Sequence, residues 1–261
     1  TITGDFMGNS AVTTSGAIYN DNTITSISGD FIGNYAKANG GAIYNNKGTI
    51  GTITGDFIGN NAGNMGGAIY NNAETIGTIT GDFISNSAKK NSGAIYNYGG
   101  AITSITGNFI GNRGTSGGAL RNDYYSRTVS GETVNYGGTI DVFTGNFIEN
   151  IASGSGGAIY NEQYSTMSDV TANFIGNTSS SSGGAIYNHG ILNLNADTQN
   201  ILFYNNTDST GYNDITQRAG VLNLNAAQGR SITFNGTVDN SSSIGSIYIN
   251  GSDDSTKTGG Q

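Results

Sequence analysis

The residues best suited to binding chemistry gather in one segment of this 261-residue chain, 121–136, which reads RNDYYSRTVSGETVNY. Its tyrosines and arginines are Arg121, Tyr124, Tyr125, Arg127 and Tyr136. Tyrosine and arginine are the side chains that most often anchor interfaces, and binding residues tend to lie in loops on a rigid scaffold. The segment therefore predicts a contact surface for a glycan or a protein. The alternative is a loop expansion that the fold merely tolerates.

Acid–base catalysis is a second chemistry to test for. Sites that cleave polysaccharides place two or three carboxylates, or a carboxylate and a cation, in one groove. The acidic residues here instead recur in a column that changes to asparagine, at Asp5, Asp30, Asp56, Asp82, Asn108, Asn146 and Asn173. Catalytic residues usually occur once in a sequence and not in a repeated column, because their pKa values are tuned by neighbours of a different kind. The only histidine, His189, is interpreted as a solvated corner residue. We therefore expect no enzyme, with a polysaccharide-active enzyme as the alternative.

The same acidic column is the place where a cation could bind. Stacked aspartates would lie about 4.8 Å apart and repel each other. Calcium prefers six or more oxygens that arrive from varied directions, and a flat column supplies few. The chain contains no cysteine, which removes disulfides and cysteine metal sites. We expect a solvated acidic stripe, no metal site and no cofactor.

Composition excludes further classes of protein. The chain has 43 glycines, no proline and a formal net charge of −8. A protein with a pI near 4.4 does not bind nucleic acid or anionic lipid through bulk electrostatics. No run approaches the roughly 18 apolar residues of a membrane helix, and no basic-then-apolar signal opens the chain. Because Thr1 begins inside a repeat, we expect the chain to be a fragment of a longer protein.

A repeat of about 26 residues must position all these side chains. One phenylalanine per repeat stands at Phe6, Phe31, Phe57, Phe83, Phe109, Phe147 and Phe174, with spacings of 25, 26, 26, 26, 38 and 27 residues. A Gly-Ala step keeps the same rhythm at Ala17, Ala42, Ala68, Ala94, Ala119, Ala158 and Ala185. Such a fixed period is typical of a solenoid. The long spacing contains the segment 121–136, which is therefore an insertion.

Each repeat contains three short extended stretches, Gly-Ala-Ile-Tyr, Thr-Ile-x-x-Ile and Gly-Asp-Phe-Ile, separated by Gly, Asn and Ser. Such runs of Ile, Thr, Tyr and Phe predict strands, and no window has the apolar spacing of a helix. Three strands per coil predict an all-β fold, a right-handed parallel β-helix. About nine coils, each rising by ~4.8 Å, would form a rod on the order of 40 Å long. We expect regular coils over 1–190, with an insertion near 123–136, and a less regular continuation over 191–261.

Stacking of the coils predicts which way each column of side chains faces. The asparagines of Phe-x-x-Asn should bond to one another at a corner, and the aliphatic column that contains Ile43 should face inward. The next column includes Tyr44, Tyr70 and Tyr96, with Arg121 in the fifth coil. Because arginine is expected where solvent reaches, we place these tyrosines outside and add them to the predicted binding surface. The direction of the isoleucine after each phenylalanine stays open.

Threonines recur beside the second strand, as at Thr49 and Thr52. A flat threonine array can bind ice, but here the column changes to Ala101. The β-propensity of threonine explains the pattern first, and an ice-binding solenoid remains a minor alternative.

The pairing of Gly-Gly-Ala-Ile with Phe-x-x-Asn resembles the polymorphic outer-membrane proteins of chlamydiae and related bacterial autotransporter passengers. Seven coils over residues 1–188 show both motifs, with Ser before Gly16 and Gly93 and with Leu120 in place of isoleucine. The tail segments GILNLNADTQNILFYNN and GVLNLNAAQGRSITFNGTV are similar to the segment that follows the repeats in that family. These short motifs are more specific for fold than for function.

The resemblance implies a surface-exposed, extracellular adhesin or structural passenger on a bacterial cell. Its partner would be a glycan or protein on a host or neighbouring cell, and its only link to the outer membrane would be a C-terminal barrel absent from this sequence. The family offers no catalytic residues. Open solenoid ends and a tyrosine stripe make self-association a further expectation. After the adhesin and the polysaccharide-active enzyme, the third possible function is a structural spacer that binds nothing.

Overall fold

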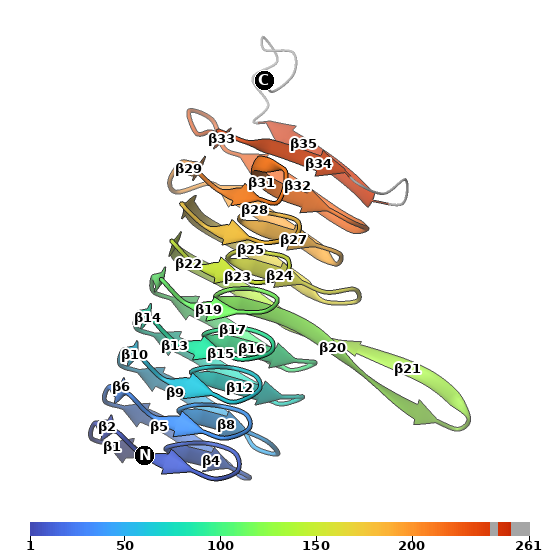
Figure 1. Ribbon diagram of the computed structural model, residues 1–261. Coiled ribbons are helices and arrows are strands. Elements are labelled where there is room, and N and C mark those ends of the chain that lie inside the picture. Colours follow the sequence, from blue (N-terminus) through green and yellow to red (C-terminus); the bar gives the residue numbers. More distant parts are fainter. Residues whose placement is uncertain (241–244, 252–261) are drawn as a thin grey trace.

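The computed structural model describes residues 1–240 and 245–251, and these form one elongated solenoid with the first and the last described strand at opposite ends (Figure 1). Every regular element in these described residues is a strand. The strands of successive coils pair in parallel along the rod. The predicted parallel β-helix with a repeat near 26 residues is therefore confirmed. Within the described part of the chain, no helix is long and apolar enough to cross a membrane.

Two of the expected strands of each coil lie in a 17-stranded sheet. The Thr-Ile strands are β1 (Ile2–Thr3), β5 (Ile24–Ser28), β9 (Ile50–Thr54), β13 (Thr75–Thr80), β17 (Ala101–Thr106), β22 (Thr139–Ile148), β25 (Thr166–Ile175), β28 (Ile191–Ala196), β32 (Gly220–Ala226) and β35 (Gly245–Gly251). The phenylalanine strands are β2 (Phe6–Met7), β6 (Phe31–Ile32), β10 (Phe57–Ile58), β14 (Phe83–Ile84), β18 (Phe109–Ile110), β29 (Ile201–Tyr204) and β33 (Ile232–Phe234). In β22 and β25 the two kinds of strand are continuous.

The third expected strand lies in an 18-stranded sheet. These Ile-Tyr-Asn strands and their counterparts are β4 (Ile18–Asn20), β8 (Ile43–Asn45), β12 (Ile69–Asn72), β16 (Ile95–Tyr98), β20 (Leu120–Val129), β24 (Ile159–Asn161), β27 (Ile186–Asn188), β31 (Gly211–Gln217) and β34 (Thr237–Asn240). The sequence analysis predicted three strands per coil. The structure contains a fourth kind of strand, which is two residues long. These are β3 (Ser10–Ala11), β7 (Tyr35–Ala36), β11 (Asn61–Ala62), β15 (Ser87–Ala88), β19 (Arg113–Gly114), β23 (Ile151–Ala152), β26 (Thr178–Ser179) and β30 (Thr207–Asp208).

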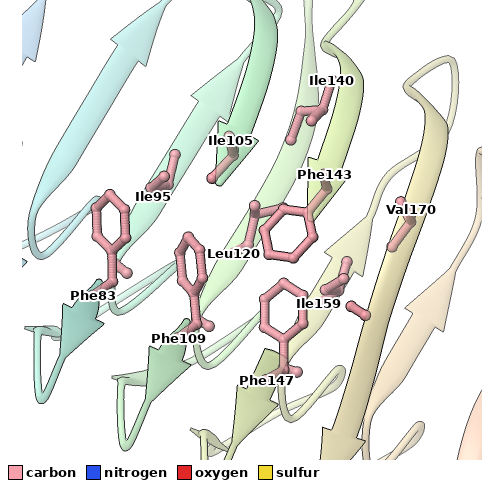
Figure 2. Close-up of a cluster of buried hydrophobic side chains, with 14 of the residues drawn as sticks. Phe83, Ile95, Ile105, Phe109, Leu120, Ile140, Phe143, Phe147, Ile159 and Val170 are labelled. Atoms are coloured by element: carbon pink, nitrogen blue, oxygen red, sulfur yellow. The ribbon is translucent and has the colours of Figure 1, made fainter. Parts of the chain in front are cut away.

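The core is a column of stacked phenylalanine rings flanked by isoleucine and alanine (Figure 2). Ring centroids are 4.7 Å apart at Phe57–Phe83 and 4.5 Å apart at Phe83–Phe109. At the coil that carries the insertion, Phe143 replaces the isoleucine of the preceding coil, Ile105, and stacks 4.7 Å from Phe147. All of these rings are fully buried. The isoleucine after each phenylalanine is half-buried, because side chains alternate along a strand and it faces outward.

Two ladders of buried asparagine join the coils at their corners. In the predicted ladder, Asn60 Nδ2 donates to Asn86 Oδ1 at 3.0 Å and to the carbonyl oxygen of Phe31 at 2.8 Å. The Ile-Tyr-Asn strands form a second ladder, in which Asn71 Nδ2 donates to Asn97 Oδ1 at 2.9 Å. These amides satisfy backbone groups that the turns leave unpaired, which is how a buried corner avoids a desolvation penalty.

The Gly-Gly-Ala step is fixed by backbone geometry. Gly66 has a φ of 65°, in the left-handed region that favours glycine. Gly67 packs against the carbonyl oxygen of Gly93 in the next coil so closely that no Cβ fits between them. Ala68, which follows, is fully buried in the core. The second glycine of the step is therefore required by the packing of coil on coil, whereas the first position also accepts serine, as at Ser15 and Ser92.

The described residues after 190 continue the stack. Strand β28 pairs in register with β32, from Ile191 opposite Val221 to Ala196 opposite Ala226. Strand β32 pairs in the same way with β35. The phenylalanine column also continues, through Phe203 and Phe234. Of the segment expected as a less regular continuation, residues 241–244 and 252–261 lie outside the described residues.

Candidate binding surface

The insertion is a β-hairpin that projects from the rod, where a loop was expected (Figure 1). Strand β20 runs out from the solenoid and pairs antiparallel with β21 (Glu132–Gly137) over six residue pairs. The turn consists of Ser130 and Gly131, with φ values of 52° and 88°. Positive φ at both central residues matches the type I′ turns that two-residue hairpins prefer. The Ser-Gly dipeptide between two runs rich in Tyr, Thr and Val is the sequence signal for this hairpin.

The two faces of the hairpin differ in chemistry. On one face, Tyr125 lies opposite Tyr136 and Arg127 lies opposite Val134. The two tyrosine rings stack 4.9 Å apart, and the guanidinium of Arg127 lies 5.8 Å from the ring centre of Tyr136. The other face, apart from Tyr124 at its base, carries small polar side chains, at Ser126, Thr128, Thr133 and Asn135. One face of the hairpin therefore combines aromatic and cationic groups.

Aromatic contacts fix the base of the hairpin to the coils on both sides. Tyr125 lies 6.1 Å from Tyr98 in the preceding coil. Tyr124 meets the ring of Tyr164 in the following coil edge-on, at 5.1 Å and an interplanar angle of 76°. Gly99 leaves room for the ring of Tyr125, where a Cβ would collide with it. The hairpin therefore leaves the rod at an orientation that side-chain packing determines.

Arg121 does not point into the hairpin surface, although it was predicted as part of it. Its Nε lies 2.9 Å from Asp123 Oδ2 and its Nη2 lies 3.1 Å from Glu162 Oε2. Its guanidinium also covers the ring of Tyr160, 4.4 Å from the ring centre. The side chain is only 14% exposed. The sequence prediction explained this arginine by contact with solvent, and that explanation is wrong. Two carboxylates compensate its charge.

The network around Arg121 spans four coils. The hydroxyl of Tyr96 donates to Asp123 Oδ2 at 2.7 Å, and His189 Nδ1 lies 3.0 Å from Glu162 Oε1. Burial lowers the pKa of Arg121, but Asp123, Tyr96 and Tyr160 together outweigh burial and hold that pKa above its ordinary value. Burial, reinforced by Asp123, raises the pKa of Tyr96. The sequence analysis did not identify Asp123 or Glu162 as partners of Arg121. The signal for Asp123 was its position, because a charged residue there replaces Tyr98 of the preceding coil.

The tyrosine column was expected on the outer surface, and this is wrong for two of its members. Tyr19 is 48% exposed and Tyr44 is half-buried, but Tyr70 and Tyr96 are only 6% and 3% exposed. Their side chains leave the sheet on its outward side, where the ring of Tyr98 lies 6.5 Å from Tyr70 and 5.9 Å from Tyr96. Aromatic neighbours therefore cover these two rings and remove them from the accessible surface.

The acidic column has a structural function that the sequence did not reveal. Asp30 Oδ1 accepts the backbone N–H of Asp56 at 2.8 Å, and Asp56 Oδ1 accepts that of Asp82 at 2.8 Å. Each carboxylate thus joins two coils at a half-buried position between the Thr-Ile strand and the phenylalanine strand. No three histidine, cysteine or acidic side chains gather in a metal-binding arrangement among the described residues.

The repeats of the chain match one known family. Segments 28–46, 142–162 and 171–189 match the model of the Chlamydia polymorphic membrane protein repeat. The first of these segments runs through β6 and β7 to β8, so one match covers most of a coil. No match was found among the curated proteins or the solved structures. The repeat match suggests a surface-exposed, autotransporter-like passenger. In these repeats the chain resembles the chlamydial polymorphic membrane proteins.

Proposed function

We propose that this solenoid is the surface-exposed passenger of an autotransporter-like protein and acts as an adhesin. Its ligand is a glycan or a protein on a host or neighbouring cell. The observation that carries the proposal is the β20–β21 hairpin, which projects from a rigid rod and exposes Arg127 and half-exposes Tyr125 and Tyr136 on one face. Tyrosine and arginine on a rigid support provide contact area at low entropic cost.

We propose binding rather than catalysis as the activity of this surface. Two unlike carboxylates near the base of the hairpin, Asp123 and Glu162, both accept hydrogen bonds from Arg121. Carboxylates engaged in this way hold the coils together and have less freedom to exchange protons with a substrate. A structural spacer, with no ligand at all, is the alternative that the experiment must separate from an adhesin.

The test measures binding of the purified protein to a panel of glycans and extracellular-matrix proteins. In a shortened variant, Gly-Gly replaces residues 124–138 and restores the Gly99–Gly100 corner of the preceding coil, while Asp123 keeps its contact with Arg121. A double variant, with alanine at Tyr125 and Arg127, tests the side chains of the aromatic face without removing the strands or the contact between Tyr124 and Tyr164. Alanine at Tyr19, which is exposed in the first coil, is the control.

Saturable binding by the native protein and the Tyr19 variant, lost in both hairpin variants, supports an adhesin with its contact surface on the hairpin. Binding that both hairpin variants retain moves the contact surface to another face of the rod. Absence of binding by every form supports the structural spacer.

A further inference from the structure

We propose that the cleft beside His189 binds a single neutral pyranose ring of a glycan. The cleft measures about 290 Å³ and is lined by Gln163, Tyr164, Ser165, His189, Gly190, Ile191, Ala219 and Gly220. This site is separate from the aromatic face of the hairpin, and the proposal does not depend on whether the hairpin binds a surface.

The cleft exists because neighbouring coils have corners of different length. Between Asn161 and β25 the chain uses four residues, in a turn where the N–H of Ser165 donates to the carbonyl of Glu162 at 3.1 Å. The corresponding corner of the next coil, between β27 and β28, uses only His189 and Gly190. The longer corner therefore overhangs the shorter one. Gly190 packs against the carbonyl oxygens of Ser165 and Glu162, and Gly220 packs against that of Gly190, so closely that neither position has room for a Cβ.

One wall of the cleft is apolar and accessible. Tyr164 is 52% exposed and Ile191 is 42% exposed, which are high fractions for such large side chains. Tyr164 also has a φ of 67°, in the left-handed region that residues other than glycine seldom occupy. Backbone held in such a conformation is enriched at ligand sites. The edge-on contact with Tyr124 holds the ring in place.

The polar groups of the cleft are held by the ion-pair network behind it. His189 Nδ1 is engaged by Glu162, while Glu162 is itself held by Arg121 and by the backbone N–H of Gln163. Within the described residues, His189 Nε2 has no hydrogen-bonding partner, so it is free to exchange a hydrogen bond with a ligand. The side chain of Gln163 is exposed at the rim and can both donate and accept.

These features together define the class of ligand. Arg121 is paired with two carboxylates, Asp123 and Glu162, so the cleft offers no uncompensated cation to attract an anionic ligand. Its volume is close to the lower end of the range for small-molecule sites, about 300–1,000 Å³. An apolar wall opposite hydrogen-bonding groups suits a pyranose, which has a C–H face for stacking and hydroxyls at its edge.

The experiment uses His189, the only histidine, as an NMR reporter. The imidazole C–H signals are followed while methyl glycosides of glucose, galactose, mannose and N-acetylglucosamine are added singly to the full chain. Tyr164→Gly removes the aromatic wall and suits the left-handed backbone, so it keeps the fold. Gln163→Ala tests the rim without altering the wall. Tyr204→Ala, at a tyrosine 48% exposed elsewhere on the rod, is the control.

We expect saturable shifts of the His189 signals with at least one glycoside, at a dissociation constant in the millimolar range. Tyr164→Gly should weaken that binding at least tenfold and Gln163→Ala severalfold, while Tyr204→Ala should leave it unchanged. Absence of a shift with all four glycosides would overturn the proposal. Equal binding by the native protein and Tyr164→Gly would overturn it as well, because the sugar would then lie elsewhere.

Discussion

Asn206 Nδ2 donates a hydrogen bond of 2.8 Å to Asp214 Oδ1, and this contact ends the ladder of corner asparagines. The asparagines of the ladder are Asn9, Asn34, Asn60, Asn86, Asn112, Asn150, Asn177 and Asn206. Each amide donates to the oxygen of the next coil, as Asn177 Nδ2 donates to Asn206 Oδ1 at 3.0 Å. The last amide therefore needs an acceptor, and an ionised carboxylate is purely an acceptor.

Asp214 should make the stability of the solenoid depend on pH. Burial raises the pKa of its carboxyl above the ordinary value, although hydrogen bonds from Asn206 and from the N–H of Gly236 oppose this rise. A raised pKa means that the folded state binds the proton more tightly than the unfolded chain. The associated stability is present below the unfolded pKa and is lost as the pH rises through the folded pKa.

Asp214→Asn should abolish this pH-dependent step. Urea unfolding of both proteins from pH 3.5 to pH 7 gives the difference in free energy of unfolding, in which effects of other carboxylates cancel. We expect the variant to be less stable than the native protein by a constant amount, because its amide N–H₂ faces the N–H of Gly236. In addition, as the pH rises, the free energy of unfolding of the variant should increase relative to that of the native protein. A difference that does not vary with pH would contradict this linkage.

Asn86 should be essential because four groups depend on its amide. Its Oδ1 accepts from the backbone N–H and the Nδ2 of Asn60, and its Nδ2 donates to the carbonyl of Phe57 and to Asn112 Oδ1. An unsatisfied buried polar group costs about 1–3 kcal/mol. Asn86→Ala should therefore lower the free energy of unfolding by at least ~3 kcal/mol in urea denaturation followed by circular dichroism.

Asn72→Ala is the matched control for this loss. Its amide also joins two coils, donating to Asn46 Oδ1 at 2.9 Å, but both residues are half-buried at the surface. Water can replace that bond, so the change should cost less than ~1 kcal/mol. Similar losses in the two variants would show that burial of the ladder does not determine its contribution.

Phe83 and Ile84 are adjacent residues that should respond differently to the same substitution. The ring of Phe83 is fully buried between Phe57 and Phe109, whereas Ile84 is half-buried and faces outward. Removing a buried phenylalanine costs about 3–5 kcal/mol. Ile84→Ala should cost about 1 kcal/mol, because it buries less apolar area. Urea midpoints that shift equally would mean that the strand does not alternate as described.

Stacking explains why so much of the fold could be predicted from the sequence. In register, Phe57 lies against Phe83 and Ile69 against Ile95, so each position faces its own copy in the next coil. A residue type that packs well against an identical residue can occupy the same position in every coil. The period of the repeat and the core positions can therefore be recognised directly in the sequence. The asparagine ladder was predictable for the same reason, since an amide can donate to an identical amide.

The candidate sites were not predictable in this way, because they depend on residues that occur once. Arg121 reads as a solvated member of a tyrosine column until Asp123 and Glu162, from two coils, are seen to face it. The cleft beside His189 depends on a difference of two residues between neighbouring corners, a detail that a search for a common period averages out.

Arg121 should contribute to stability through its two carboxylates. Arg121→Met keeps most of the side-chain volume but leaves Asp123 and Glu162, whose side chains are 9% and 15% exposed, without their cation. Breaking a buried ion pair by removing one partner costs about 3–5 kcal/mol, and we expect a loss near ~3 kcal/mol in urea unfolding. The loss should persist in 1 M salt, because buried pairs are screened much less than exposed ones.

Two further variants test that explanation. Arg127→Met, at an exposed arginine on the hairpin, should change the free energy of unfolding by less than ~0.5 kcal/mol. Adding Asp123→Asn and Glu162→Gln to Arg121→Met should recover part of the lost stability, because the uncompensated charges then disappear. If the triple variant were no more stable than Arg121→Met, loss of packing around Tyr160 would explain the destabilisation better than charge. That result would assign the arginine the function of a covering side chain, as the tyrosines have in other coils.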